Sequence, residues 1–357
     1  MVSFATFGNE LYTGKRSYNF VGKRRIWFTI AAVAVLLSIL MPIVRGGFNL
    51  GIEFRGGSEF TVSNVQNTDP GLGTKAVTDI VPGSVPRVAN IAGNTMRIQT
   101  DKLSGDQTLK VKAALLKAYG VNEDHVTSTF IGPTWGADVT KQALLGLVIF
   151  VILAAGLMAL YFRTWRMSVA AIVGLLVVII TTAGTYSASD FEVTPSAIIG
   201  FLTILGYSLY DTVVVFDKIR ENTSDIGSST RRTFAEEVNL AVNQTLVRSI
   251  NTMMVAVLPV GSILFIGAFL LGAGTLRDLS LSLFIGIIIS TFSTIFVASP
   301  LYAWLRSTEP ELKKQARRVQ QRRAADKAAL RAGGETVPVK FQAVFSVNKS
   351  GRRPSAG

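Results

Sequence analysis

Long apolar stretches separated by short charged segments recur along the chain. A helix needs about 20 mostly apolar residues to cross the roughly 30 Å hydrocarbon core of a bilayer. Five stretches have about that length, and a sixth region, Val238–Leu276, is longer. We therefore predict six transmembrane helices, over residues 26–44, 142–162, 167–189, 193–216, 238–276 and 279–305.

The fifth of these regions is too long for one straight span. Residues that weaken helices predict a kink and a loose far end, and they are Pro259, Gly261, Gly267, Gly272 and Gly274. We expect its first residues to lie along the membrane surface. The first stretch is followed by Met41-Pro-Ile-Val44 rather than by a small-residue cleavage site, so we expect a retained span and not a signal peptide.

The segment between the first two spans, residues 46–140, has a different pattern. Alternating and periodic apolar positions predict strands at 58–65, 86–91, 94–100 and 126–131, with helices near 74–81 and 105–119. We expect the second helix to bury Leu109, Ala113 and Leu116. The order β-α-β-β-α-β is that of a ferredoxin-like α+β domain.

Basic residues are concentrated at the two ends of the chain. Of the net charge of +13, residues 1–25 contribute five basic side chains and one acid, and residues 306–357 contribute thirteen basic side chains and four acids. The positive-inside rule then places both ends in the cytoplasm. We expect a cytoplasmic segment at 1–25, a first span at 26–45, an extracytoplasmic domain at 46–140, five spans within 141–306, and a basic, partly disordered cytoplasmic tail at 307–357.

Composition excludes several kinds of chemistry. The chain is 49% hydrophobic and only 17% charged, and it has no cysteine and one histidine, His125. A cysteine nucleophile, a cysteine-ligated metal and a multi-histidine metal site are therefore excluded. The glycine and lysine residues near the N-terminus do not form a phosphate-binding loop. We expect no enzyme activity, no cofactor and no bound nucleic acid.

Two charged residues interrupt the apolar spans, Asp211 in the fourth and Arg248 near the start of the fifth. Ionisable residues inside a membrane are costly and are therefore candidates for function. The two spans run antiparallel, so the side chains could meet at a similar depth and form a proton relay. The alternative is a buried ion pair that only fixes helix packing.

Polar residues accompany both charges. Ser208 lies three residues before Asp211, and the residues spaced by three or four positions from Arg248 share its helix face; they are Gln244, Asn251 and Thr252. Such a polar stripe suits a water wire or a subunit contact, and it is also compatible with interhelical hydrogen bonding alone.

Three motifs resemble the SecD/SecF family of bacterial protein-export membrane proteins, and within it the smaller, SecF-type subunits. They are Gly51-Ile-Glu-Phe-Arg-Gly-Gly57, the stretch from Leu205 to Asn222, and Asn243-Gln-Thr-Leu-Val-Arg-Ser-Ile-Asn-Thr252. The motif glycines are Gly51, Gly56, Gly57 and Gly206. Glu53 stands where the family has an aspartate. The resemblance covers about residues 1–306.

This resemblance implies a fold and a function. The family belongs to the resistance-nodulation-division transporter superfamily, in which two six-helix halves pack around a proton relay. Asp211 would match the protonatable carboxylate and Arg248 its partner, and a further aspartate would come from SecD. The chain would then sit in the cell membrane beside the SecYEG channel and use the proton motive force to assist export of preproteins delivered by SecA. It would catalyse no covalent reaction. For the basic tail we expect anionic lipid as a partner, with the ribosome as a lesser alternative.

Two other functions remain open from the sequence. One is a half-size, proton-driven exporter of small molecules or lipids, although only one compact extracytoplasmic domain is available to line a substrate path. The other is a non-transporting assembly subunit of the translocon, in which Asp211 and Arg248 would be purely structural.

Overall fold

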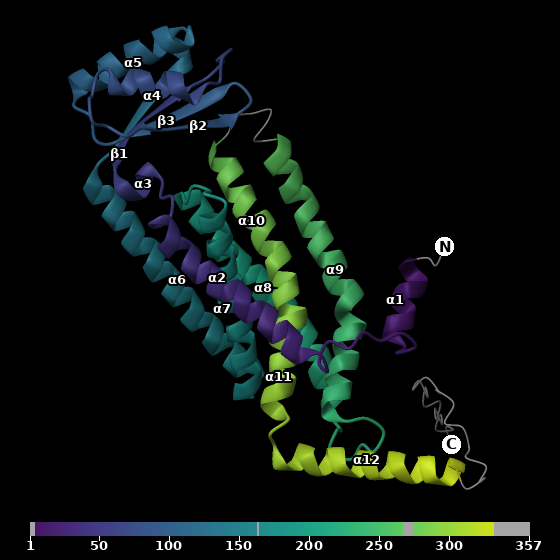
Figure 1. Ribbon diagram of the computed structural model, residues 1–357. Helices are drawn as coiled ribbons and strands as arrows, with labels where there is room; N and C mark the ends of the chain where they lie inside the picture. Colours follow the sequence, from purple (N-terminus) through teal and green to yellow (C-terminus); the bar gives the residue numbers. More distant parts are fainter. Residues whose placement is uncertain (1–3, 163, 267–273, 332–357) are drawn as a thin grey trace, which may run out of the picture.

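A computed structural model describes residues 4–162, 164–266 and 274–331 (Figure 1). A bundle of long helices carries a small sheet domain at one end, and a single helix lies across the other end. Within these residues, six helical segments are long and apolar enough to cross a membrane. They are α2 (Arg24–Arg45), α6 (Pro133–Phe162), α7 (Trp165–Ala188), α8 (Pro195–Thr223), α9 (Phe234–Ile266), and α10 (Gly274–Ser293) continued by the π-helical segment η3 (Thr294–Ala298) and α11 (Ser299–Arg306).

Several helix ends differ from the sequence-based expectation. α6 begins at Pro133, within the segment expected to belong to the extracytoplasmic domain, because polar residues can extend a helix beyond its apolar part. α9 runs without interruption from Phe234 through Pro259, so its first turns are not a separate surface segment. Gly274 already belongs to α10. Gly267, Gly272 and the tail beyond residue 331 lie outside the described residues.

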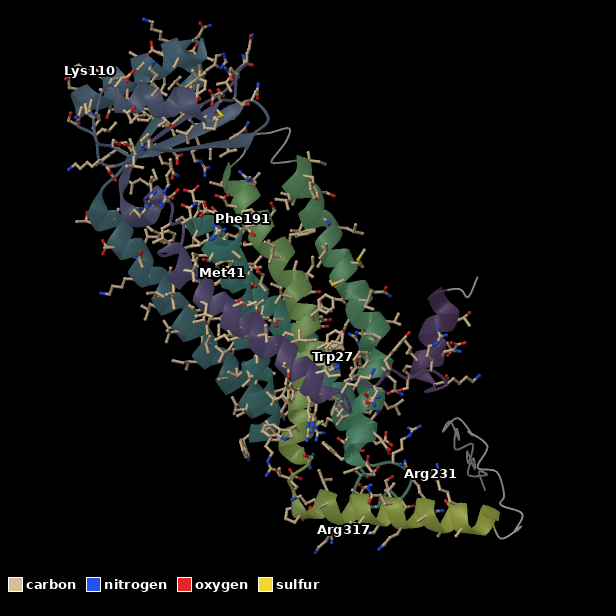
Figure 2. The ribbon with its side chains drawn as sticks, in the orientation of Figure 1. Trp27, Met41, Lys110, Phe191, Arg231 and Arg317 are labelled. Atoms are coloured by element: carbon tan, nitrogen blue, oxygen red, sulfur yellow. The ribbon has the colours of Figure 1, made fainter. Side chains whose placement is uncertain are left out.

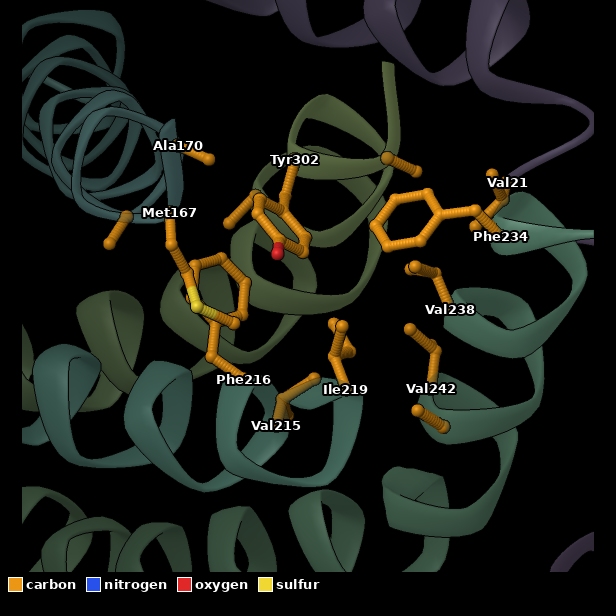
Figure 3. Packing of buried hydrophobic residues seen from close by; sticks show 14 of the residues in the cluster. Val21, Met167, Ala170, Val215, Phe216, Ile219, Phe234, Val238, Val242 and Tyr302 are labelled. Atoms are coloured by element: carbon orange, nitrogen blue, oxygen red, sulfur yellow. The ribbon is translucent and has the colours of Figure 1, made fainter. Parts of the chain in front are cut away.

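The helices are unequally enclosed by the rest of the chain. In α7 and in the last helical segment, half of the most apolar stretch of the helix is buried inside the protein, whereas in α2 none of that stretch is buried. The main hydrophobic core lies toward the end opposite the sheet domain, where Tyr302 packs against Phe216 and Phe234, and Met167 lies beside Phe216 (Figure 3). α2 therefore lies at the periphery and leaves most of its apolar side chains uncovered.

The sheet domain has the predicted order of strands and helices. Its four strands form an antiparallel sheet of order β2-β3-β1-β4. Phe60, Met96 and Ile98 are buried with residues of the two helices on one face, whereas Glu59 pairs with Gln99 on the other. The elements are β1 (Gly57–Val62), α4 (Pro70–Thr78), β2 (Arg87–Ala92), β3 (Thr95–Thr100), α5 (Gly105–Tyr119), η1 (Glu123–His125) and β4 (Val126–Ile131).

The buried face of α5 differs from the prediction. Val111, Leu115 and Tyr119 are buried, while Leu109 is 69% exposed and Ala113 is also exposed. Apolar residues occur on two neighbouring stripes of this helix, so periodicity alone did not decide between them. Leu116, also predicted to be buried, is half-buried and packs against the same core.

The glycine-rich motif forms the passage from the first span into the sheet. The short helix α3 (Ile52–Arg55) lies between Gly51 and two glycines with positive φ, Gly56 (76°) and Gly57 (137°). A Cβ atom at Gly57 would lie 2.5 Å from the carbonyl oxygen of Thr100. Only glycine fits this turn without strain. Gly206 differs, because a Cβ atom there would meet no neighbouring atom within 4 Å.

Two further helices lie outside the bundle core. α1 (Phe4–Tyr12) packs beside α9, and α12 (Pro310–Arg331) crosses the end of the bundle opposite the sheet domain (Figure 1). α12 begins at Pro310, where the motif Glu309-Pro310-Glu311 predicts a helix start.

Candidate functional site

Asp211 lies inside the helix bundle, in the middle of α8, and is 3% exposed. Its Oδ1 atom accepts a hydrogen bond of 2.9 Å from the hydroxyl of Ser249 on α9. Its Oδ2 atom is buried and has no hydrogen-bond partner among the described residues. A buried carboxylate with one unsatisfied oxygen is energetically costly. The site therefore holds a group whose charge the surroundings only partly compensate.

Buried hydroxyl groups from three helical segments surround this carboxylate. Ser208 is 2% exposed on the same helix, one turn before Asp211. The hydroxyls of Thr212 and Thr294 lie 3.1 Å apart and join α8 to the start of η3. The Ser299 hydroxyl donates to the carbonyl oxygen of Thr294 across this π-helical turn. π-Helical turns are rare and frequently occur at functional sites.

Arg248 does not reach Asp211 in this structure. It is exposed, and it forms no ion pair with a carboxylate of the described residues. Consecutive residues of a helix are rotated by about 100° around its axis, so Ser249 and Arg248 project in different directions. Ser249 points at Asp211, and the arginine is exposed.

The polar residues predicted to support the relay do not lie together in the structure. Only Ser208 belongs to the Asp211 site. Gln244 donates to the carbonyl oxygen of Tyr12 (3.0 Å) and accepts from Asn222 (2.9 Å), so it connects α1, α8 and α9. Asn251 is exposed, and the Thr252 hydroxyl donates to the carbonyl oxygen of Arg248 on its own helix.

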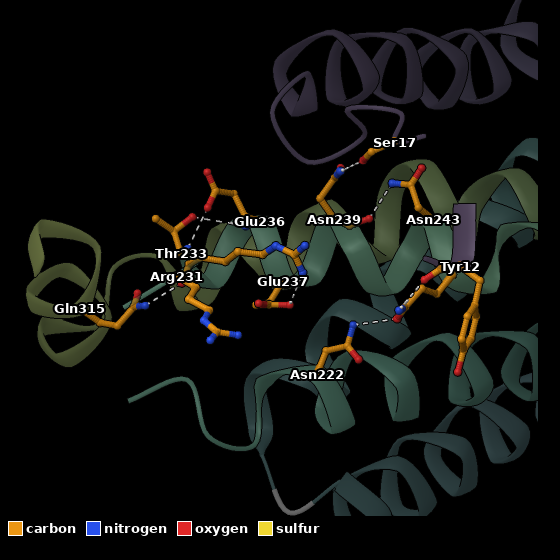
Figure 4. Close-up of polar contacts among 12 residues, drawn as sticks. Tyr12, Ser17, Asn222, Arg231, Thr233, Glu236, Glu237, Asn239, Asn243 and Gln315 are labelled. Carbon is orange, nitrogen blue, oxygen red and sulfur yellow. Dashed lines mark hydrogen bonds and ion pairs between the residues drawn. The ribbon is translucent and has the colours of Figure 1, made fainter. Parts of the chain in front are cut away.

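Side chains in the first turns of α9 bind the N-terminal segment through hydrogen bonds (Figure 4). The side-chain oxygen of Asn243 accepts from the backbone nitrogen of Tyr18 at 2.7 Å, and that of Asn239 accepts from Phe20 at 2.8 Å. Asn243 is fully buried. Asn243 of the third motif and Asn239 one turn before it therefore satisfy backbone groups of a chain segment that has no regular secondary structure.

The basic helix α12 is attached to the loop before α9. Gln315 is 1% exposed, and its amide nitrogen donates to the carbonyl oxygens of Ser229 (3.0 Å) and Arg232 (2.8 Å). Arg323 donates two hydrogen bonds of 2.8 Å to the carboxylate of Glu236. Arg322 also donates a hydrogen bond of 2.6 Å to the hydroxyl of Thr230 in the same loop.

Residues that complete the site were only partly evident from the sequence. Ser249 is one of several polar residues near Arg248, and nothing in the local pattern marks it as the one that faces Asp211. Thr212 and Thr294 occur among many hydroxyl residues of the spans. Their role depends on the packing of α8 against the end of α10, which brings together residues 82 positions apart.

The chain matches two family models. Residues 111–308 match "Protein export membrane protein SecD/SecF, C-terminal", and residues 43–63 match the "SecD/SecF GG Motif". The chain is 42% identical to the protein translocase subunit SecF of Streptomyces coelicolor, over 91% of this chain and 86% of that protein. It is 41% identical to SecF of Mycobacterium tuberculosis, over 92% of this chain and 77% of that protein.

Solved structures with a similar fold come from a longer protein. The crystal structure of SecDF from Thermus thermophilus, a translocon-associated membrane protein, superposes with a TM-score of 0.70 at 27% identity. The match covers 82% of this chain and 39% of that chain, so this chain spans less than half of SecDF. With the six long apolar helices, this similarity shows a polytopic helical membrane protein.

Proposed function

The chain belongs to the SecD/SecF family of protein-export membrane proteins, and we propose that with SecD it uses the proton motive force to assist preprotein export through the Sec channel. It serves as an accessory subunit of the translocase and catalyses no covalent reaction. In this proposal the proton is bound and released at Asp211, with Arg248 as the partner in the relay.

One observation carries the proton-coupling part of this proposal. Asp211 is 3% exposed within an apolar helix, and one of its carboxylate oxygens has no partner among the described residues. The charged and neutral forms of such a group favour different packing of the surrounding helices. Moving one charge through 100 mV supplies about 2.3 kcal/mol, which changes a two-state population by about fifty-fold. Ser249 and Thr294 lie on the elements whose positions would respond.

The exposed face of α9 supports the proposal that a helix of another subunit binds beside Arg248. Val255 and Leu258, on the same uncovered helix, are 72% and 62% exposed. A guanidinium facing lipid at this depth would be costly, so we propose that SecD covers this face and supplies a carboxylate to Arg248. A relative from Thermus thermophilus named SecDF carries the region similar to this chain in a longer polypeptide, with 38% of its length matched. This supports the partnership.

The distribution of charge supports one orientation in the cell membrane. The basic helix α12 lies at the end opposite the sheet domain. By the positive-inside rule, we propose that both termini are cytoplasmic and that the sheet domain is an extracytoplasmic, ferredoxin-like domain. The segments proposed earlier, 1–25, 26–45, 46–140, 141–306 and 307–357, follow this orientation. Anionic lipid is the proposed partner of the basic tail, and SecYEG with SecA forms the proposed translocon.

The test is preprotein export in vesicles that contain the chain with SecD and the translocon. Asp211→Asn removes the charge, and Asp217→Asn is the matched control, because Asp217 lies on the same helix but accepts a hydrogen bond from Tyr161 near its end. We expect the proton gradient to stimulate export with the wild type and the control, and not with Asp211→Asn. Equal stimulation of all three would contradict proton coupling and favour a structural subunit of the translocon.

A further inference from the structure

The sheet domain meets the end of the helix bundle through a set of charged and polar side chains, which we call the junction network. At its centre is Arg97 on β3, whose side chain is 13% exposed. One guanidinium nitrogen lies 2.8 Å from Oε2 of Glu192 in the loop between α7 and α8, and Nε lies 3.7 Å from Oε2 of Glu59. The network comprises Glu53, Glu59, Arg97, Gln99, Glu192 and Asp278.

Other contacts cross the same boundary. Gln99 donates to Glu59 at 3.0 Å and also to Glu192. Arg277 at the start of α10 donates to the carbonyl oxygen of Ile91 at 3.3 Å. Two backbone hydrogen bonds, of 2.9 and 2.8 Å, connect Val193 to the chain around Gly51, next to Phe191 (Figure 2). These contacts hold the domain to the ends of α7, α8 and α10.

Carboxyl groups outnumber guanidinium groups in this network. Glu53, Glu59, Glu192 and Asp278 lie around Arg97, and Asp278 is only 9% exposed. Two further cations lie nearby: Arg277 is directed at a backbone carbonyl, and Arg55 on α3 interacts electrostatically with Glu192. Several negative charges in a partly buried site repel one another unless one of them is neutralised. A proton on one of these carboxyl groups would relieve that repulsion.

Among the glutamates of the junction network, Glu53 has the fewest hydrogen bonds to offset a negative charge. Its Oε2 atom is buried and has no hydrogen-bond partner among the described residues, whereas Glu59 and Glu192 both accept from Arg97 or Gln99. This oxygen lies so close to Gly51 that a Cβ atom there would be 2.4 Å away. Burial raises the pKa of Glu53, the carboxylates of Glu192 and Glu59 raise it further, and a backbone hydrogen bond and Arg97 lower it.

We propose that Glu53 is a second proton-binding site, separate from Asp211, and that a proton on Glu53 docks the sheet domain onto the helix bundle. The groups that face it are Glu59 on β1, Arg97 on β3 and Glu192 before α8, with Asp278 and Arg277 beyond them on α10. α6 contributes its backbone, since Gly136 packs against the carbonyl oxygen of Phe54. The site responds to the compartment that contains the sheet domain, which rests on the proposed orientation.

The sign of the pH dependence follows from these contacts. Docking keeps Glu53 away from water and near other carboxylates, so the docked state binds the proton more tightly than an undocked state does. Docking is therefore strongest at low pH and weakens as the pH rises through the raised pKa of Glu53. In the docked state Arg97 pairs with both Glu59 and Glu192.

Hydrogen exchange of the full-length chain in lipid nanodiscs measures docking directly. The amides of Gly51 and Val193 donate the two backbone hydrogen bonds of the junction, so peptides that cover them report its opening. After correction for the intrinsic pH dependence of exchange, we expect protection of these peptides to fall on the order of threefold or more between pH 4.5, the ordinary pKa of a glutamate, and pH 8. Peptides from α4 report the domain itself and are expected to remain unchanged.

Three variants separate the proton site from a merely structural contact. Glu53→Gln should retain high protection at both pH values, because its side chain is always neutral. Glu192→Gln should lose protection at both, because Arg97 loses its closest carboxylate partner. Asp106→Asn, at an exposed position of the same domain, should behave like the wild type.

The hydrogen-exchange results test this proposal without an export assay. If Glu53→Gln keeps the pH dependence of the wild type, Glu53 is not the proton site. If Glu53→Gln does not fold, Glu53→Asp serves instead: it retains a carboxyl group and should retain the pH dependence, and its loss would contradict the proposal. Asp211→Asn should keep the pH-dependent protection, so failure of the junction proposal and failure of proton coupling at Asp211 are distinguishable.

Discussion

The hydroxyl of Ser249 donates a hydrogen bond of 2.9 Å to Oδ1 of Asp211 and so joins α9 to α8 inside the bundle. This contact determines the direction of the preceding side chain. Because consecutive helical residues differ by about 100°, Arg248 faces out of the chain when Ser249 faces in. The carboxylate and the arginine of the proposed relay therefore form no ion pair within the chain, and the exposed arginine is open to another subunit.

Removing the Ser249 hydroxyl should impair the proton site while leaving the fold intact. Ser249→Ala removes the hydrogen bond that Asp211 Oδ1 accepts, and a hydrogen bond to a charged group contributes about 1.5–3 kcal/mol. We expect the gradient-stimulated part of export to fall several-fold. Ser262→Ala is the control, since that hydroxyl bonds only to its own helix. Equal export by the two variants would show that Ser249 does not support Asp211.

Replacing Arg248 should affect assembly and export more than the stability of the chain itself. The arginine is exposed and forms no ion pair within the described part of the chain, so Arg248→Met should change unfolding stability by less than about 0.5 kcal/mol. We expect loss of gradient-stimulated export and weaker co-purification with SecD. Arg25→Met provides a control at another exposed basic residue. A strongly destabilised but transport-competent variant would contradict this assignment.

The second glycine of the Gly56-Gly57 pair should be sterically irreplaceable. Gly57 has φ of 137°, and a Cβ atom would collide with the backbone of Thr100 on the neighbouring strand. Gly57→Ala should destabilise the sheet domain by about 1–3 kcal/mol, measured by pulse proteolysis. Gly105→Ala is the matched control, because open space surrounds that position at the start of α5. Similar stability of the two variants would be inconsistent with the close approach.

The attachment of α12 should depend on one glutamine. Gln315→Met preserves the apolar stem but leaves the carbonyl oxygens of Ser229 and Arg232 without their donor, at about 1–3 kcal/mol for each unsatisfied group. We expect trypsin to cleave the arginine-rich helix several-fold faster than in the wild type. The exposed Gln320→Met should be cleaved at the wild-type rate. Unchanged cleavage of Gln315→Met would show that α12 is held by other contacts.

Much of the architecture was predictable because it depends on local patterns. A run of about 20 apolar residues can hide its backbone polar groups only as a helix in lipid, so the six spans follow from hydropathy. The order of strands and helices in the sheet domain follows from alternating and helical periodicity in segments such as 94–100 and 105–119. The helix boundaries were less accurate, because α6 continues into polar residues as far back as Pro133.

The sequence by itself identified Asp211, Arg248 and the glycine motif as unusual, since a charge in an apolar run or repeated glycines need no structure to be noticed. Tertiary packing alone decided that Ser249 and Thr294 complete the Asp211 site, that Arg248 faces outward, and that Glu53 joins the junction network. Local pattern limits which residues share an element, but the direction of each helix face is set by contacts between segments far apart in the chain, such as Thr212 with Thr294.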